Sequence, residues 1–287
     1  MIRLLGRRAW GAALTVSLLT FTVANETHGA GRHITVASTT STENSGLFDH
    51  VLPLFETRTG ISVRVIAKGT GQAIEIARRG DADVLLVHHR PSEEKFVAQG
   101  FGLKRREVMY NDFVIVGPRD DPADIGGGHD ALTALRLIAA SSAPFLSRGD
   151  ESGTHRRELA LWREAALDVD GAGFSWYREA GAGMGAALNI AAEAEAYILA
   201  DRGTWLGFHN KRNLEILVEG DKRLINIYSV ILVNPVRHPH VKAKDGRTFI
   251  EWLLSPPGQA AIAGFRIAGE QPFFPLGTTG AYGTRPR

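Results

Sequence analysis

The chain has 287 residues, of which 44% are hydrophobic and 22% are charged. This length is sufficient for two lobes, and no internal repeat or low-complexity tract divides it. The formal net charge is only +2, and no basic stripe indicates nucleic-acid binding. There is no cysteine, which excludes disulfide bonds and an acylated N-terminal anchor.

The amino terminus has the pattern of a secretory signal peptide. Arg3, Arg7 and Arg8 precede an apolar run over residues 9–24, which is too short and too interrupted for a transmembrane helix. We predict a signal peptide over residues 1–30. Its removal would take away three arginines and one glutamate, leaving equal numbers of basic and acidic side chains. With no anchoring cysteine, the mature chain is expected to be soluble in a Gram-negative periplasm.

Three strand-to-helix units follow in the first third of the chain. Residues 34–37, 61–67 and 84–87 are β-type runs, each followed by a polar segment and then by helical spacing. The first polar segment, residues 38–42, is a loop of five consecutive hydroxyl residues; such a run alone is more often a turn with a helix cap. Together the units predict a doubly wound sheet, whose crevice lies outside the carboxyl ends of the strands.

The chain is predicted to leave this first lobe and to return to it. A strand over residues 109–116 runs into a polar, glycine-rich stretch, and a strand over residues 225–233 carries the chain back. We therefore predict a discontinuous first lobe of residues 31–117 and 232–287 and a second lobe of residues 118–231. Two crossings form a hinge that can close over a ligand.

The segment over residues 147–158 has the composition of an anion cradle. It combines Arg148, Ser152, Gly153 and Thr154 at the entrance to an amphipathic helix, where free backbone N–H groups and the helix dipole favour negative charge. The alternative is a simple helix start, with Ser152 or Thr154 as N-cap and Arg148 on the surface.

Three loops thus supply donors to one predicted crevice: residues 38–42, residues 69–71 and the segment after residue 147. Glycines there bring backbone N–H groups close to a ligand, and hydroxyls add further donors. An arginine can donate two N–H bonds to a tetrahedral dianion at once. The candidate ligand-binding residues are Ser38, Thr39, Thr40, Ser41, Thr70, His88, Arg148, Ser152, Gly153 and Thr154.

Several separated motifs carry a resemblance to a known family. The run Arg148-x-Asp150-x-Ser152-Gly153-Thr154 resembles the anion loop of periplasmic phosphate-binding proteins. The longer combination resembles the periplasmic tungstate-binding proteins of the TupA type, with one departure: Ser38 stands where that family usually has threonine. The segments that carry this resemblance are residues 38–47, 69–73, 80–88, 147–158, 176–179 and 183–185.

The resemblance implies an α/β fold of the type 2 periplasmic binding protein class, with two lobes, each a doubly wound sheet flanked by helices, and a two-strand hinge. It implies tungstate as ligand, bound through its oxygens without a cofactor or metal ion. It further implies delivery to the permease subunits of an ABC importer in the inner membrane, with their cytoplasmic ATPase. We expect the protein to be a monomer that does not bind nucleic acid.

The residue after the third strand bears on the choice of anion. Phosphate carries a proton at pH 7, and phosphate-binding proteins place an aspartate there to accept it. Matching the strands places His88 near that position. A histidine can donate to a proton-free oxyanion, which favours tungstate, molybdate or sulfate over phosphate. Helix packing or the surface is the alternative role for His88.

Other functions have weaker support. A receptor of the same fold for molybdate, sulfate or phosphate is the main alternative. A hydrolase is the next, since Asp150, Ser152 and His155 include the residue types of a catalytic triad. Residues this close at a helix entrance cannot form the required relay, and no Gly-x-Ser-x-Gly elbow is present. We therefore expect a binding protein and not an enzyme.

Overall fold

The computed structural model describes residues 32–169 and 173–276. The predicted signal peptide lies outside the described residues. The elements, in chain order, are β1 (His33–Thr39), α1 (Thr40–Asn44), α2 (Leu47–Thr59), β2 (Ser62–Lys68), α3 (Thr70–Arg79), β3 (Val84–Val87), α4 (Arg90–Ala98), β4 (Gly102–Pro118), α5 (Ala131–Ser141), β5 (Phe145–Ser147), α6 (Gly153–Glu164), β6 (Tyr177–Glu179), α7 (Met184–Ala194), β7 (Ile198–Asp201), α8 (Arg202–Gly207), β8 (Leu214–Val218), the 3₁₀ turn η1 (Lys222–Leu224), β9 (Ile225–Val233), α9 (Ala243–Leu254), α10 (Pro256–Gly264) and β10 (Phe274–Pro275).

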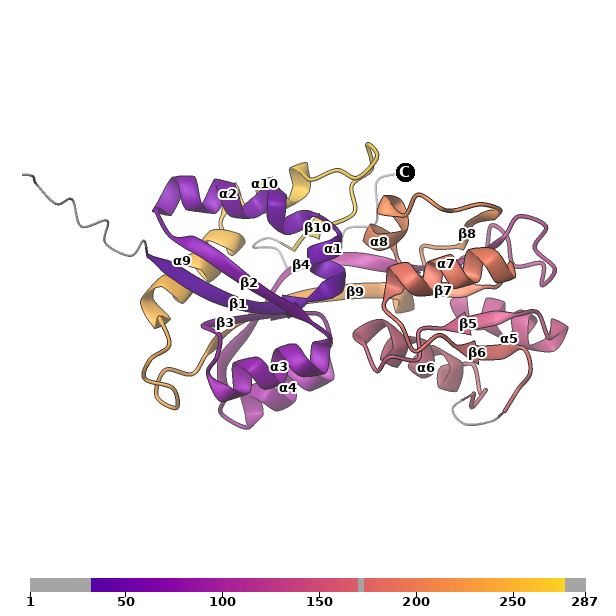
Figure 1. The fold of residues 1–287 in the computed structure, drawn as a ribbon, viewed down its shortest axis with the longest axis horizontal. Coiled ribbons are helices and arrows are strands. Elements are labelled where there is room, and N and C mark those ends of the chain that lie inside the picture. The colour runs from indigo at the N-terminus through magenta and orange to yellow at the C-terminus, as the bar shows by residue number, and fades with distance from the viewer. Residues whose placement is uncertain (1–31, 170–172, 277–287) are drawn as a thin grey trace, which may run out of the picture. The chain divides into compact units, whose positions relative to one another are not determined.

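The main sheet has the strand order β10-β4-β9-β3-β1-β2, and β7 and β8 also pair with β4 (Figure 1). Strand β1 is parallel to both β2 and β3, so these three strands end at the same edge. Strand β9 runs antiparallel to β3 and β4. A second sheet consists of β5 and β6 in parallel. Among the described helices, none is both long and apolar enough to cross a membrane.

Strand β4 changes partners halfway along its length. It pairs with β9 as far as Asp112, and from Phe113 it pairs with β7 and then β8. The sequence predicted this strand over residues 109–116 only, and the charged run from Lys104 to Glu107 was not predicted as strand. Pairing with β9 stabilises the additional strand residues before Met109. Among these residues, Arg105 forms ion pairs with Glu93 and Glu107.

The hydrophobic core falls into two parts along the chain. In the first part, alternate residues of β1 and β3 face α2, α9 and α10 on one side of the sheet and α3 and α4 on the other. The second part uses β4 from Phe113 onward, where Phe113 and Ile115 face α5 and α6, and Val114 and Val116 face α7 and α8. The alternation follows from the two-residue repeat of a strand. The bounds predicted for the two lobes remain a prediction.

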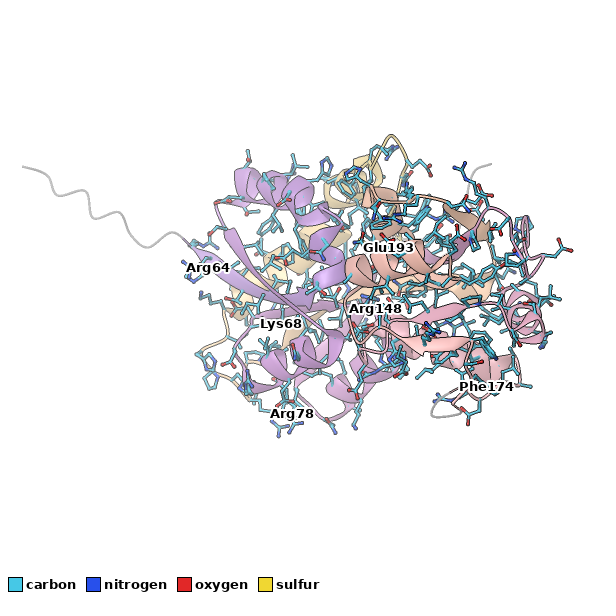
Figure 2. All side chains as sticks on the ribbon, turned by 45° about the vertical axis from the view of Figure 1, so that its right-hand side comes forward. Arg64, Lys68, Arg78, Arg148, Phe174 and Glu193 are labelled. Atoms are coloured by element: carbon cyan, nitrogen blue, oxygen red, sulfur yellow. The ribbon has the colours of Figure 1, made fainter. Side chains whose placement is uncertain are left out.

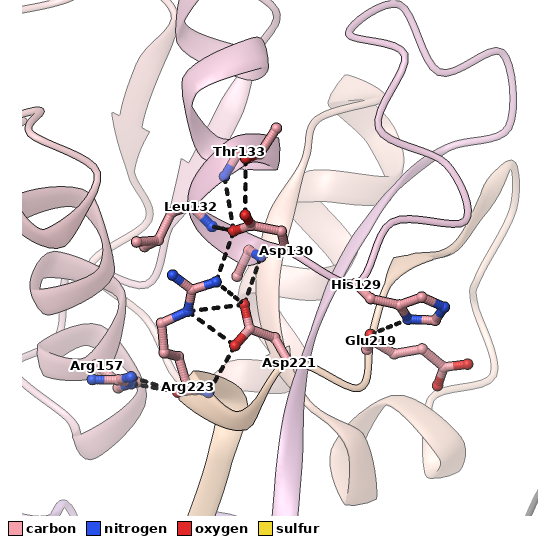
Figure 3. Close-up of polar contacts among 9 residues, drawn as sticks. His129, Asp130, Leu132, Thr133, Arg157, Glu219, Asp221 and Arg223 are labelled. Atoms are coloured by element: carbon pink, nitrogen blue, oxygen red, sulfur yellow. Dashed lines mark hydrogen bonds and ion pairs between the residues drawn. The ribbon is translucent and has the colours of Figure 1, made fainter.

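A network of ion pairs and hydrogen bonds connects three elements around the second part of the core. The buried carboxylate of Asp221 accepts from the backbone N–H of Ala131 at the start of α5 and pairs with Arg223 (Figure 3). Arg223 also pairs with Asp130, the N-cap of α5, and its backbone carbonyl accepts from Arg157. These contacts attach η1 to α5 and α6.

The hydroxyl-rich segment after β1 differs from its prediction. We expected a loop over residues 38–42, but β1 extends through Thr39 and a short helix, α1, follows at once. The side chain of Thr39 accepts from the backbone N–H of Thr42 as the N-cap of α1. Hydroxyl residues compete for backbone groups in this way, so the run that resembles a loop in the sequence forms a strand end and a capped helix.

Candidate functional site

One cavity of about 320 Å³ is lined by hydrogen-bond donors from segments that adjoin both parts of the core. Thr39 and Lys68 are the last residues of β1 and β2, His88 directly follows β3, and Arg148 directly follows β5. The cavity therefore lies outside the carboxyl ends of these strands, as the sequence predicted. It is lined by Thr39, Thr40, Ser41, Lys68, Gly69, Thr70, Gly71, Gln72, His88, Arg148, Asp150, Glu151, Ser152, Gly153, Thr154, Arg156 and Gly183.

Helix amino termini form much of the lining. Helices α1, α3, α6 and α7 each begin at this cavity. Gly69 and Gly183, the N-caps of α3 and α7, make no side-chain cap bond, so the first N–H groups of these two helices are left for other acceptors. Partial positive charge at helix starts favours an anion in the space that they surround.

Arg148 is buried but not fully bonded. Its side chain is 5% exposed, one terminal nitrogen donates to Asp150 at 2.5 Å, and the other lies 3.4 Å from the Thr154 hydroxyl. Within the described residues, its Nε has no hydrogen-bond partner. Because a buried, unsatisfied guanidinium nitrogen is costly, this site favours an acceptor beside Arg148.

The loop that carries Arg148 requires a glycine after it. Gly149 has φ of +60°, and a Cβ at this position would lie 2.6 Å from the Cβ of Glu179. Glu151 also has a positive φ, of 54°, which is uncommon for a residue with a side chain. The backbone N–H of Ser152 donates to Asp150 at 3.2 Å, so the same carboxylate fixes both the arginine and the helix entrance.

Ser152 fits both of the roles that the sequence left open. It is the N-cap of α6, and its hydroxyl oxygen accepts from the backbone N–H of His155 at 3.2 Å. An accepting hydroxyl keeps its own hydrogen. The capping serine can therefore also donate to a ligand, and it lines the cavity with Gly153 and Thr154.

His88 is enclosed by polar partners. Its Nε2 lies 3.3 Å from the hydroxyls of Thr39 and Ser41, and its Nδ1 lies 3.1 Å from the amide oxygen of Asn226. The ring stacks on Tyr228 with centroids 4.6 Å apart. Burial lowers the pKa of His88 to about 4, and the positive charge of Arg148 acts in the same direction, while the Asn226 contact opposes it.

This pKa changes the role expected for His88. At neutral pH the ring is uncharged, and its Nδ1 hydrogen is directed to Asn226, so its Nε2 is an acceptor. Direct donation from His88 to a proton-free anion, as the sequence analysis expected, would require protonation of the ring. The stack on Tyr228 agrees in part with the alternative that His88 is a packing residue. His88 nevertheless also lines the cavity.

Residues distant in sequence approach closely at the cavity. A Cβ at Gly153 would lie 3.2 Å from Cε1 of His88 and 3.4 Å from the Thr70 hydroxyl. A Cβ at Gly71 would lie 3.8 Å from a terminal nitrogen of Arg156. The loops predicted to share one crevice therefore do so.

Nine of the ten candidate residues line the cavity, and Ser38 does not. Its side chain is fully buried, and its hydroxyl donates to the backbone carbonyl of Leu86 in β3 at 2.7 Å. Sequence reasoning missed Lys68 and Arg156, which add positive charge to that of Arg148 at the cavity. Figure 2 labels Lys68, at the end of β2, and Arg148, which follows β5. Sequence reasoning also missed Gln72 as a lining residue, although Gln72 lies in the segment 69–73 that carries part of the family resemblance.

The possible triad does not form. The Ser152 hydroxyl bonds to the backbone of His155 and not to its ring, and the ring Nδ1 accepts from the backbone N–H of Glu151. The ring Nε2 lies 3.8 Å from Glu179. Within the described residues, no group of three or more acidic or histidine side chains is placed to hold a metal ion.

The fold and the site correspond to a known class of protein. A family model described as a PBP superfamily domain matches residues 24–257, which is most of the chain. This match defines the class, and it agrees with a type 2 binding-protein architecture, in which a central sheet is covered by helices.

Individual relatives narrow the class to one family. The tungstate-binding protein TupA of Peptoclostridium acidaminophilum is 47% identical over 231 residues, which are 80% of each chain. The structure of TupA from Desulfovibrio alaskensis G20 is 43% identical with a TM-score of 0.78, over 85% of this chain and 98% of that one. The structure described as the tungstate ABC transporter from Geobacter sulfurreducens is 47% identical with a TM-score of 0.75, over 81% and 98%. The chain belongs to the TupA-type family, and the resemblance drawn from its motifs is confirmed.

Proposed function

We propose that the chain binds a tetrahedral oxyanion, tungstate, in the 320 Å³ cavity and delivers it to an ABC importer. The observation that carries this proposal is the convergence of four helix starts, a set of hydroxyls and a buried arginine on one space. Preorganised N–H and O–H donors suit an anion that has no hydrogen to give. The function is binding without turnover, in keeping with the family.

The proposed ligand contacts come from both sides of the cavity. On one side are the hydroxyls of residues 39–41 and of Thr70, and on the other are the Arg148 guanidinium and the α6 entrance over residues 152–154. The lining contains three basic and two acidic side chains, which leaves an excess positive charge to meet the dianion. Because Asp150 already accepts from Arg148 and from the Ser152 backbone, it orients the arginine and does not compete with the ligand.

The size of the cavity favours closure on binding. It has room for about ten water molecules at roughly 30 Å³ each, whereas a tetrahedral oxyanion has only five heavy atoms. We propose that the lobe formed by residues 31–117 and 232–287 and the lobe formed by residues 118–231 approach each other around the anion. Strands β4 and β9 would form the hinge, since β4 pairs with elements of both parts of the core.

Tungstate is preferred to molybdate because relatives at 43% to 47% identity are described as tungstate-binding or as a tungstate ABC transporter. The two anions are nearly equal in size, and both carry no hydrogen at pH 7, so the hydroxyl donors serve both alike. Molybdate is therefore the second ligand to test. We further propose export to the periplasm through a signal peptide over residues 1–30 and delivery to inner-membrane permease subunits.

Thermal unfolding with added anions tests the proposal. A ligand that binds only the folded state stabilises it by about 2.7 kcal/mol at a hundredfold excess over the dissociation constant. We expect tungstate to raise the unfolding temperature of the chain lacking residues 1–30, and equal concentrations of sulfate and phosphate to have much smaller effects. A rise with phosphate and none with tungstate would overturn the proposal.

A further inference from the structure

A line of buried polar side chains extends from the cavity into the interior. The amide nitrogen of Asn226 donates to the amide oxygen of Asn111 at 2.8 Å, and the amide nitrogen of Asn111 donates to Asp201 at 2.6 Å. Together with the contact between His88 and Asn226, these bonds connect the cavity to a carboxylate. All four side chains are buried.

The carboxylate gives this line a direction. The other oxygen of Asp201 accepts from the backbone N–H of Thr204 at 3.0 Å as the N-cap of α8. Burial raises the pKa of Asp201, whereas hydrogen bonds from Asn111, Thr204 and Tyr228 lower it and favour the carboxylate, which accepts on both oxygens. Asn111 must then turn its amide nitrogen to Asp201 and its oxygen to Asn226. An amide offers donors on one atom and acceptors on the other, and the same constraint passes to Asn226, whose oxygen faces His88.

We propose that Asp201 acts through Asn111 and Asn226 to hold His88 as the tautomer with its hydrogen on Nδ1. The three residues are positioning residues for the site, since none of them lines the cavity. Histidine tautomers are assigned from the partners of each nitrogen, and here the partner of Nδ1 is an acceptor fixed by a distant carboxylate. Nε2 therefore faces the hydroxyls of Thr39 and Ser41 as an acceptor.

The consequence for the ligand rests on the proposed function. A proton-free oxyanion has no hydrogen to give to Nε2, so the Thr39 or Ser41 hydroxyl must supply it. The Thr39 hydroxyl also lies 2.7 Å from the Thr42 hydroxyl and 3.1 Å from the Ser41 hydroxyl. With Thr39 donating to His88 and Thr42 donating to Thr39, the Ser41 hydroxyl keeps its hydrogen for the anion. We call the hydrogen-bonded series Asp201, Asn111 and Asn226 the relay. It sets the orientation of the hydroxyl donors at the start of α1 before the ligand binds.

The groups around the ring support the neutral form. Arg148, which lines the cavity, acts on His88 with its positive charge, and Tyr228 covers one ring face. The Tyr228 hydroxyl also donates, at 3.4 Å, to the Asp201 oxygen that accepts from Asn111. Asn111 and Asn226 lie opposite each other in register on β4 and β9, so the relay is built on the two strands proposed as the hinge.

The test is a measurement of which ring nitrogen of His88 carries the hydrogen. Chain labelled with ¹⁵N-histidine is studied without ligand by long-range ¹H–¹⁵N correlation at pH 7, and His88→Gln identifies the signal. We expect a protonated Nδ1 and a bare Nε2. In Asp201→Asn, the new amide nitrogen faces Asn111, both asparagine amides turn over, and the hydrogen of His88 moves to Nε2.

Asp221→Asn is the matched control, because Asp221 is also a buried N-cap aspartate but has no bond to the relay. Its His88 signals should match those of the unaltered chain. If Asp201→Asn does not fold, Asn111→Leu interrupts the relay without touching His88 and should yield both tautomers. A hydrogen on Nε2 in the unaltered chain, or an unchanged tautomer in folded Asp201→Asn or Asn111→Leu, would overturn the inference. Because no ligand is present, this result is independent of whether tungstate binds.

Discussion

Arg148 has an unsatisfied buried nitrogen and a fixed orientation, which is the combination expected of an anion contact. Its Nε has no partner among the described residues, and Asp150 holds one terminal nitrogen. The bond to Asp150 therefore fixes the guanidinium at the cavity before a ligand binds.

We predict that Arg148→Ala weakens tungstate binding by about two orders of magnitude or more, since hydrogen bonds to charged groups contribute roughly 1.5–3 kcal/mol each. Titration calorimetry measures the change. Arg119→Ala is the control, because Arg119 is an exposed arginine that pairs with Glu215 away from the cavity. Equal tungstate affinities of the two variants would show that Arg148 does not contact the ligand.

Gly153 brings the start of α6 close to His88, which follows β3, and to Thr70. A methyl group there would press on His88 at 3.2 Å and on Thr70 at 3.4 Å. We predict that Gly153→Ala lowers tungstate affinity at least tenfold, with little loss of stability. Gly185→Ala is the control, since Gly185 is also in the first turn of a helix and a Cβ there meets nothing within 4 Å. Similar affinities for the two variants would contradict the packing argument.

The site residues show what strand geometry allows a sequence to predict. Ser38 and Thr39 are neighbours in β1, so their side chains point to opposite faces. The hydroxyl run alone did not fix which of them faces the crevice, because the end of the strand was not known. Lys68 and Arg156 were missed for a different reason: only the tertiary structure brings the end of β2 and the first turn of α6 to the same space.

At the scale of elements, the site consists mainly of helix entrances, and their caps distinguish structural from ligand-binding roles. Ser152 caps α6 at the cavity, and Asp130 caps α5 away from it. Both side chains accept from backbone N–H groups of the first turn. The two caps are therefore comparable for stability but not for binding.

We predict that Ser152→Ala and Asp130→Ala each lower the free energy of unfolding by about 1 kcal/mol, the usual cost of a lost cap. Only Ser152→Ala should also weaken tungstate binding, because it removes a donor from the cavity. Denaturant unfolding and calorimetry on both variants provide the comparison. A binding defect of the same size in Asp130→Ala would show that helix stability, and not the serine hydroxyl, limits affinity.

Much of the element pattern was predictable from the chain. The strands β1, β2 and β3, each followed by a helix, were confirmed, because β-type runs followed by polar segments have a strong pattern. The first half of β4 was not predicted, because its charged side chains form ion pairs with residues elsewhere in the sequence, such as that of Arg105 with Glu93. Short elements such as β5 and α8 have too few residues to show a period.

At the scale of the whole molecule, two buried groups give opposite pH dependence to stability. Burial raises the pKa of Glu158 to about 7, despite hydrogen bonds from Tyr177, Ser147 and Trp162, whereas burial lowers that of His88 to about 4. Between pH 4.5 and 6.5 the folded state holds the extra proton at Glu158, and the unfolded state holds it at His88. The two contributions therefore oppose each other.

We predict that single variants reveal these slopes. Relative to the unaltered chain, Glu158→Gln should gain stability as pH rises from 4.5 to 7, because it removes a contribution that falls with pH. His88→Gln should lose stability as pH rises from 4 to 6.5, relative to the same reference. Each slope is at most about 1.4 kcal/mol per pH unit. Urea unfolding at three pH values measures both, and parallel profiles for all three chains would contradict the prediction.

We propose that the cavity at the carboxyl ends of β1, β2, β3 and β5 is a tungstate site. Titration calorimetry of the dialysed chain lacking residues 1–30 tests it most directly, with tungstate, molybdate, sulfate and phosphate in separate experiments at pH 7. We predict tight binding of one tungstate per chain and far weaker binding of phosphate. Micromolar phosphate binding with no heat from tungstate would contradict the account.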